Sequence, residues 1–443
     1  MFARVLALVI ATSTSAAAGG MVLPVQGVHS LERAGALVAG ADDPDALWLD
    51  PAGLARLTGD GRRAFLFDIA YVYQPVQYTP AGALAAIAND QPGAVGIPTV
   101  AASLGVGDRL VIAAGITGQY GGLARYDATG AQRYALVSTT GTSFAIISVG
   151  AGYVVGPGLR VGATVQDRVT ALDLQVVASA CPPQQTCAPG DAAYDLPLAQ
   201  NETAYLSPSG SLGVQYDLGV LATVGATLQA PSRVSQGGTL TARMPTSPEF
   251  TGAAQVGTAA TASFWLPPTA RAGIELHPTR EVRVEAALDV ELWSLQDAID
   301  ITPSKISIAG GPAGAFALSP MTIARDYHTS FAPSLGGEVR LGTAQLAAGV
   351  AYETAAAPAA DVSVLTVDAP KWLVGLGGGY DEAGWQIGAA VGYAHLADVD
   401  VSTSQAAVHE LQPLRAQPTP VAVNAGVYRS YYVVAGLRLA RKF

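Results

Sequence analysis

The segment from Glu281 to Leu292 alternates between apolar and charged side chains. Val282, Val284, Ala286, Leu288, Val290 and Leu292 share one parity, and Glu281, Arg283, Glu285, Asp289 and Glu291 share the other. A period of two over a dozen residues predicts a β-strand with one apolar face and one charged face. In a soluble sandwich the charged face would meet water outside, whereas in a membrane barrel it would meet water in the lumen.

Other segments repeat this alternation. They include 65–74, 264–277 and 385–393. The run 159–165 alternates well until Asp167 falls on the apolar parity, which indicates a bulge or the end of the lipid zone.

Composition decides between the two kinds of β protein. Only 13% of the 443 residues are charged and 50% are hydrophobic, against about 25% charged in a typical soluble domain. The charge-free stretch 134–159 is interrupted by 138–143 and by 156–158, so it is too short for a membrane helix. We therefore predict an all-β, transmembrane antiparallel barrel, and the net charge of -10 argues against nucleic-acid binding.

The N-terminus has the pattern of a cleavable signal peptide over residues 1–18. Arg4 supplies the positive start, 5–11 are apolar, and Ala16-Ala17-Ala18 ends in an Ala-x-Ala pattern. The protein is therefore expected to be exported. In an oxidising compartment, Cys181 and Cys187 are expected to form a local disulfide that stiffens an exposed loop.

Short and long connections alternate along the chain. Short turns are predicted at 107–108, 156–158, 217–219, 277–280, 342–343 and 381–384, and longer connections at 79–96, 119–141, 179–204, 231–259, 301–326, 356–369 and 402–424. Six turns and seven loops join about 14 strands over residues 64–443, an even number that places the first and last residues of the barrel on the periplasmic side. The terminal Phe443, after alternating apolar residues, resembles the signal read by the barrel assembly machinery.

Residues 19–63 lack this alternation. Asp42-Asp43-Pro44-Asp45 and Asp50-Pro51-Ala52-Gly53-Leu54 have the Asp and Pro residues typical of helix starts. Such a segment is large enough to form a mostly helical plug, or hatch, inside a lumen that would otherwise be open.

No catalytic motif is present. The chain has no Gly-x-Ser-x-Gly or His-Glu-x-x-His, and we expect no catalytic residue, metal site or cofactor. The glycine-rich run 375–379 lies in a strand pattern rather than before a helix. The charged residues predicted to face the lumen, such as Glu275 and Glu285, are expected to form a network of paired charges that holds the plug. Alternatively, one or two basic residues could bind an anionic head group, and the candidates are Arg271, Arg283, Arg340 and Lys371.

The sequence resembles the FadL family of outer-membrane transporters for long-chain fatty acids and other hydrophobic compounds. The resemblance is carried by 27–36 and 41–54, which look like the family's hatch with Asp50 in place of the Asn of an Asn-Pro-Ala element. Further similarity lies in 266–273, followed by Glu285, Asp289 and Trp293-Ser294.

Membership would imply a monomeric 14-stranded barrel in the bacterial outer membrane, surrounded by lipid and lipopolysaccharide. A hydrophobic ligand would be captured at the outer loops, enter a lumenal pocket and leave through a lateral gap when the hatch rearranges. The gap would lie at a kink of the third strand, for which Gly115, Gly118, Gly121 and Gly122 are candidates.

We therefore predict passive uptake of a hydrophobic compound by a non-enzymatic barrel. The charged lumenal parity leaves a porin-like channel for small polar solutes as an alternative. An outer-membrane lipid-modifying enzyme is a third reading, because its site could be assembled from several strands without a local motif.

Overall fold

The computed structural model describes residues 27–90, 97–118 and 124–443. The segment predicted to be a signal peptide and the first part of the predicted hatch lie outside these ranges. Among the described residues, no helix is both long enough and apolar enough to cross a membrane.

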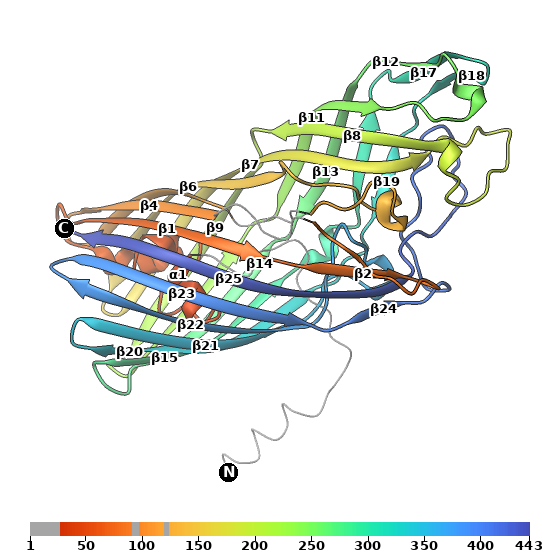
Figure 1. The fold of residues 1–443 in the computed structure, drawn as a ribbon. Coiled ribbons are helices and arrows are strands. Elements are labelled where there is room, and N and C mark those ends of the chain that lie inside the picture. Colours follow the sequence, from red (N-terminus) through yellow and green to blue (C-terminus); the bar gives the residue numbers. More distant parts are fainter. Residues whose placement is uncertain (1–26, 91–96, 119–123) are drawn as a thin grey trace.

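The chain forms a closed barrel of 14 antiparallel wall strands (Figure 1). Several wall strands consist of two segments in line. The first five are β1 (Arg63–Tyr73) with β2 (Val76–Pro80), β3 (Ile87–Ala88) with β4 (Ile97–Val106), β5 (Leu110–Thr117), β6 (Ser143–Gly156) and β7 (Leu159–Ser179). The next four are β8 (Asp195–Ala204) with β9 (Pro208–Leu218), β10 (Ala222–Gln229) with β11 (Ser232–Ala242), β13 (Ala259–Leu266) with β14 (Thr269–Leu276), and β15 (Val282–Glu291) with β16 (Ala298–Pro303).

The last five wall strands complete the circle. They are β19 (Met321–Ala324) with β20 (Ser330–Leu341), β21 (Ala344–Glu353), β22 (Lys371–Glu382), β23 (Trp385–Leu396) with β24 (Val399–Val401), and β25 (Gly426–Lys442). β25 pairs with β1 from Ala64↔Lys442 to Tyr73↔Val433, so the first and last strands close the sheet. Closure pairs the backbone groups that an open sheet would leave at its edges.

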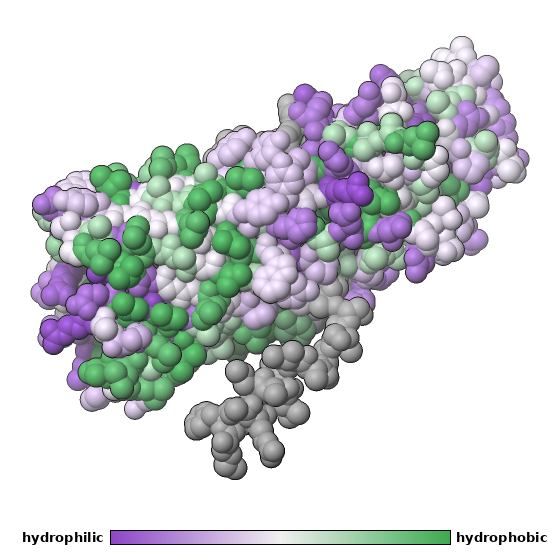
Figure 2. Space-filling model, turned by 60° about the horizontal axis from the view of Figure 1, so that its bottom comes forward, coloured by the Kyte–Doolittle hydropathy of each residue, from purple (hydrophilic) through white to green (hydrophobic). Residues whose placement is uncertain are grey.

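The predicted alternation is confirmed by burial. In β1, Phe65, Phe67, Ile69 and Tyr71 are exposed while Leu66, Asp68, Ala70 and Val72 are buried. In β15 the exposed side chains include Leu288, while Glu285 is buried on the lumenal parity. Figure 2 shows apolar side chains gathered on the wall toward the end that holds the C-terminus, whereas the far, extended end is more polar.

The six predicted short turns all connect wall strands at one end, but several predicted loops contain parts of wall strands, including 321–324 of β19 within the predicted loop 301–326. Segments 195–204 and 232–242 are the paired strands β8 and β11 rather than parts of loops. With a rise of roughly 3.3 Å per residue, the 21 residues of β7 are far longer than a bilayer core of about 30 Å. The sheet therefore projects beyond the membrane on this side.

Asp167 marks the point where β7 changes its partner from β9 to β8. The register shifts by one residue there, because Asp167 pairs with Pro208 of β9 whereas Thr170 pairs with Ala204 of β8. Asp167 Oδ1 accepts a hydrogen bond of 2.7 Å from Ser207 N in the connection between β8 and β9. Of the two readings of this residue, the shift supports the bulge, with the extra residue in the connection between β8 and β9 rather than in β7.

Short helices lie inside the barrel and in the outer loops. Inside are α1 (Val28–Glu32) and the 3-10 helices η3 (Pro44–Leu47) and η4 (Pro51–Leu57). The outer connections contain η5 (Ala131–Tyr134), η6 (Ala192–Tyr194), η7 (Pro248–Phe250), η8 (Trp293–Leu295) and η9 (Ala359–Asp361). A separate small sheet of β12 (Ala254–Val256), β17 (Ser307–Gly311) and β18 (Gly314–Ala317) lies at the tip of the extended end (Figure 1).

Candidate functional site

The described part of the hatch, residues 27–57, packs against the inner face of the barrel wall. Asp43 and Asp50 cap η3 and η4, and their side chains accept hydrogen bonds from Asp45 N and Ala52 N. Pro44 and Pro51 begin the two helices, as the sequence predicted. Almost all of these residues are buried, so the hatch fills the cross-section that it occupies.

Lumenal glycines of the wall let the hatch backbone come close. A Cβ added at Gly349 or Gly375 would collide with the backbone of Arg33 or Leu31. The same kind of contact occurs at further wall glycines, namely Gly152, Gly162, Gly225 and Gly336. Within the glycine-rich run 375–379, Gly375 and Gly377 therefore pack against the hatch, at Leu31 and Glu32.

Arg33 forms the centre of a buried ion-pair network between hatch and wall. Its guanidinium lies 2.9 Å from Glu275 and 3.2 Å from Glu285, and all three side chains are fully buried. Glu285 also accepts hydrogen bonds from Val38 N, Ala39 N and Gly40 N at 2.7–2.9 Å. One wall carboxylate thus binds three backbone N–H groups of the hatch in addition to the arginine.

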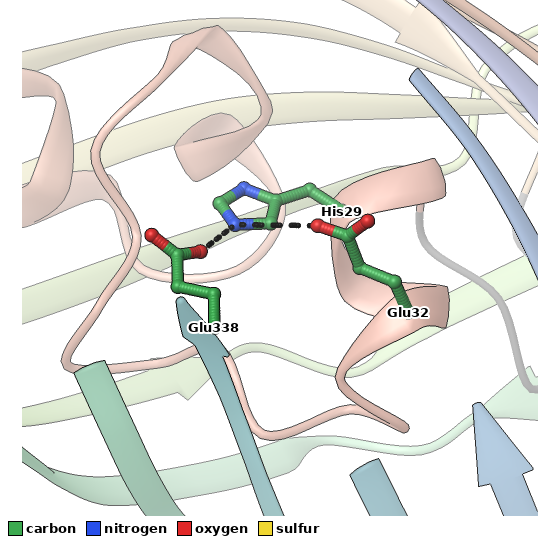
Figure 3. Close-up of side chains that lie close together, drawn as sticks. All are labelled: His29, Glu32 and Glu338. Atoms are coloured by element: carbon green, nitrogen blue, oxygen red, sulfur yellow. Dashed lines mark hydrogen bonds and ion pairs between the residues drawn. The ribbon is translucent and has the colours of Figure 1, made fainter. Parts of the chain in front are cut away.

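His29 joins a second buried cluster (Figure 3). Its Nε2 lies 3.1 Å from Glu338 Oε2 and 4.0 Å from Glu32 Oε1, and its Nδ1 lies 3.5 Å from Asp43. Burial alone lowers the pKa of His29, but the hydrogen bonds to Asp43 and Glu338 raise it to about 10. His29 is therefore a cation at neutral pH and links the hatch to β20.

Two groups in this cluster bring three potential metal ligands within 4.8 Å of one another, His29 with Glu32 and Glu338, and His29 with Asp43 and Asp45. Gln345 Nε2 already donates to Glu32 and Glu338, at 3.2 Å each. Arg438 contacts Asp43, Asp45 and Asp68. These carboxylates already have protein donors, and we interpret both groups as ion-pair networks.

Asp50 of the predicted hatch motif is fully buried. Its Oδ1 accepts a hydrogen bond of 3.0 Å from Ala52 N, and its Oδ2 has no hydrogen-bond partner among the described residues. Burial raises the pKa of Asp50 to about 7, against the effect of the Ala52 hydrogen bond. A Cβ at Gly213 of β9 would collide with this carboxylate, so the wall is shaped to receive it.

A cavity of about 90 Å³ lies between the hatch and the wall. Hatch residues Ala34, Leu37, Val38 and Leu49 form an apolar side. The wall contributes the charged residues Arg271, Asp289, Glu291 and Glu353, together with small and polar residues of β20 and β21. Because the hatch forms one side of the cavity, the volume of the cavity depends on the position of the hatch.

The four basic residues predicted to bind a head group are not gathered in one place. Arg271 lines the cavity, where it donates to Asp289 and to Trp48 O. Lys371 lies behind Glu353, with Nζ 2.8 Å from Glu353 Oε1. Arg283 binds Asp42, Glu275, Glu338 and Gly40 O, and Arg340 is half-exposed at the other end of β20, 3.5 Å from Glu338.

A larger groove of about 930 Å³ lies at the extended end of the barrel. Apolar residues line much of it, including Val137, Val176, Leu198 and Met244. Arg133 and Arg243 also line it, and Arg133 Nε lies 2.9 Å from Asp195.

The predicted kink of the third strand is only partly within the described residues. Gly115 lies in β5, which pairs in continuous register with β4 and β6. Gly118 follows the end of β5, and Gly121 and Gly122 lie outside the described residues. A Cβ at Gly115 would come within 2.7 Å of the Trp48 ring, and Trp48 Nε1 donates to Ser148 Oγ of β6 at 2.9 Å.

The predicted disulfide between Cys181 and Cys187 is present in the loop after β7. Arg415 from the last outer connection lies against it. Its guanidinium contacts Cys181 Sγ at 3.2 Å and donates to Pro182 O at 3.0 Å. The disulfide loop is thereby attached to a second loop.

Sequence reasoning missed Arg33 and Arg438 as contacts between hatch and wall, whereas Glu275 was among the charges predicted to face the lumen. Arg438 lies on the lumenal parity of the last strand, so the alternation could have identified it. Arg33 lies in a segment without periodicity, and no pattern of spacing links it to Glu275, 242 residues away.

The closed barrel, its buried hatch and the alternation of lipid-facing and lumenal side chains define a plugged transport barrel of the bacterial outer membrane. The chain belongs to the family of outer membrane protein transport proteins (OMPP1/FadL/TodX), whose model matches residues 8–432. It is thus a transporter of hydrophobic compounds rather than an enzyme, and the predicted family and location are confirmed.

Solved structures show the same fold. A FadL homologue from Pseudomonas aeruginosa is 16% identical, with a TM-score of 0.74 over 96% of this chain and 99% of that one. The Ralstonia pickettii toluene transporter TbuX is 16% identical, with a TM-score of 0.65 over 95% and 99%. The P. putida toluene transporter TodX is 15% identical, with a TM-score of 0.66 over 95% and 98%. No curated protein sequence matches the chain.

Proposed function

We propose that the protein takes up hydrophobic compounds in three steps: capture in the outer groove, transfer to the cavity beside the hatch, and lateral release when the hatch moves. The observation that carries this proposal is that the hatch both fills the lumen and forms one side of the cavity. Movement of one element would therefore enlarge the cavity and open a path from it.

The filled lumen argues against the porin-like alternative. A porin needs a continuous water channel, whereas the described hatch is held to the wall by fully buried ion pairs such as Arg33–Glu275. An apolar solute also crosses the polysaccharide-coated leaflet poorly, and a protein path with apolar walls avoids that layer.

The outer groove suits the capture step. It lies at the end of the barrel that projects beyond the lipid, and it has apolar walls with charged residues beside them. Its volume of about 930 Å³ is enough for a molecule of drug size, whereas the cavity at the hatch is smaller. A ligand would therefore bind first where space is already available.

The contact between Trp48 and Gly115 supports β5 as the site of release. The hatch ring packs directly on the third wall strand at a residue without a side chain. Withdrawal of the ring would leave that part of the wall uncovered from the inside. We propose this movement as the hatch rearrangement that admits the ligand to the membrane.

We propose further that the mature barrel begins near residue 64, after a cleaved signal over 1–18 and a hatch over 19–63. Within the described membrane-spanning part, β25 pairs with β1 and the sheet closes on itself, which favours a monomer in lipid and lipopolysaccharide. Phe443 is exposed at the end of β25, where the assembly machinery could read it.

The experiment compares uptake and conductance. In cells that lack their own family members, the protein should increase uptake of radiolabelled toluene or oleic acid, and Asp50→Ala or Pro51→Ala should impair it. Asp381→Ala and Pro278→Ala are matched controls at exposed positions of the short turns. A large steady single-channel conductance without hydrophobic uptake would overturn the proposal in favour of a porin.

A further inference from the structure

The cavity beside the hatch contains more acid than base. Three carboxylates line it, from Asp289, Glu291 and Glu353, against one guanidinium, from Arg271. The rest of its lining consists of apolar, small or serine side chains and glycine. A ligand in this cavity would meet an excess of negative charge.

The guanidinium in the cavity is already bound. Arg271 Nε lies 3.0 Å from Asp289 Oδ2, and its NH1 donates to Trp48 O at 2.6 Å. Its charge is therefore balanced by Asp289 before any ligand arrives. Lys371, the next cation, lies 2.8 Å from Glu353 and 4.0 Å from Asp368.

Glu291 has no cationic partner within ion-pair distance among the described residues. Its Oε2 accepts a hydrogen bond of 2.7 Å from Trp293 Nε1, a neutral donor. A second carboxylate brought into this small, partly apolar space would be repelled by Glu291 and would lose its own hydration. A hydroxyl or amino group could instead donate to Glu291.

We propose that Glu291, supported by Glu353, makes the hatch cavity selective against carboxylates, so that the transported compound is an apolar molecule without negative charge. This inference rests on the proposed uptake function. Its apolar part would lie against Leu37, Val38 and Leu49, and any polar end would be a hydrogen-bond donor directed at Glu291. The acidic lining of the cavity thus indicates an uncharged or cationic substrate, whereas the basic residues alone would have suggested an anionic one.

The test uses probes that are matched in shape and differ in charge. Binding of benzyl alcohol and benzoate, and of dodecan-1-ol and dodecanoate, is measured by calorimetry on the purified barrel at about pH 9, where Glu291 is ionised, with empty micelles as blank. Wild type should bind each alcohol at least about tenfold more tightly than its carboxylate. Glu291→Gln keeps an acceptor for Trp293 and should narrow that ratio about tenfold, chiefly by improving carboxylate binding.

The control is Asp381→Asn, which removes the same charge at an exposed position near the end of β22 and should leave the ratio unchanged. Glu353→Gln is a second variant, expected to act in the same direction because it releases Lys371. Equal binding of alcohol and carboxylate by wild type, or an unchanged ratio in both folded variants, would overturn the selectivity while leaving uptake intact. If no probe of either kind binds or enters cells, the proposed uptake function fails and the selectivity fails with it.

Discussion

Arg33 of the hatch and Glu275 of the wall form an ion pair of 2.9 Å in which neither side chain is accessible to solvent. Glu275 also lies 3.0 Å from Arg283, which in turn donates to Gly40 O of the hatch. The pair is thus part of a continuous connection between hatch and wall, and the energy of hatch docking depends on it.

Arg33→Met should weaken hatch docking while leaving the barrel folded. Removing one partner of a buried ion pair costs up to about 3–5 kcal/mol. The cost here is at or below the lower end of that range, because Glu275 keeps its contact with Arg283. We expect frequent openings in planar-bilayer recordings where the wild type is quiet. Arg429→Met breaks the exposed pair with Asp398, worth at most about 1 kcal/mol, and should stay quiet. Identical recordings from both variants would contradict a docking role for Arg33.

Gly349→Ala should displace the hatch by steric contact alone. The added methyl group would collide with the backbone of Arg33, which cannot move aside as a flexible side chain could. Gly237→Ala is the matched control, since a Cβ there meets no atom within 4 Å. We expect faster hydrogen exchange in α1 for the first variant only, with heat-modifiable mobility on gels retained by both.

The sequence predicted the wall of this barrel better than its interior. Alternation identifies lipid-facing residues because the apolar face of each strand can be read from that strand's sequence alone, as β1 shows with Phe65 and Asp68. Pairing inside the lumen depends on how the strands and hatch are placed in three dimensions. Arg283 was therefore predicted to face the lumen, but its contacts with Asp42 and Gly40 could not be.

The predicted loop boundaries were wrong for a related reason. Strands β8 and β11 lie beyond the lipid and pair with their neighbours on the sheet. Outside the membrane, neither face must be uniformly apolar, so the alternation that identified the other strands is weaker there. The length of β7 could not be read from a hydropathy pattern that ends near Asp167.

Asp50 should make hatch docking depend on pH. Its pKa is about 7 in the docked hatch and near 4 when solvated. Between these values the undocked carboxyl has lost its proton while the docked one keeps it, so docking weakens as pH rises from about 4 to 7. Across this window the free energy of hatch docking changes by at most about 4 kcal/mol. Above and below the window, the contribution of Asp50 does not vary with pH.

Asp50→Asn should remove that slope, because the amide does not titrate. Hydrogen exchange of η4, corrected for intrinsic rates, measures docking at each pH. Asp191→Asn is the control, since Asp191 caps η6 in the same way in an exposed loop. His29, with its pKa raised to about 10, loses its contribution only above about pH 6.5, so the two windows can be separated. An equal slope in the Asn variant would rule out Asp50 as its source.

Replacing both cysteines by serine should loosen the outer loop without affecting the barrel. The disulfide closes a loop with a sequence separation of 6, for which chain entropy gives about 2 kcal/mol. Arg415 would also lose its contact with Cys181. We expect faster proteolysis within 180–194 and unchanged heat-modifiable mobility. Arg415→Gln should give part of the same effect, whereas protection equal to wild type in both variants would show that the loop is held by other contacts.

Trp48→Ala should accelerate uptake if the ring covers the release path at β5. The substitution removes the contact with Gly115 and the hydrogen bond to Ser148, and Trp48→Phe removes the hydrogen bond but keeps a ring. We therefore expect initial uptake rates of labelled toluene to rise severalfold for Ala and less for Phe. Trp372→Ala, on the exposed lipid face of β22, is the control for loss of a tryptophan. Uptake that is unchanged in the Ala variant, with the barrel folded, would mean that release does not pass the contact between Trp48 and Gly115.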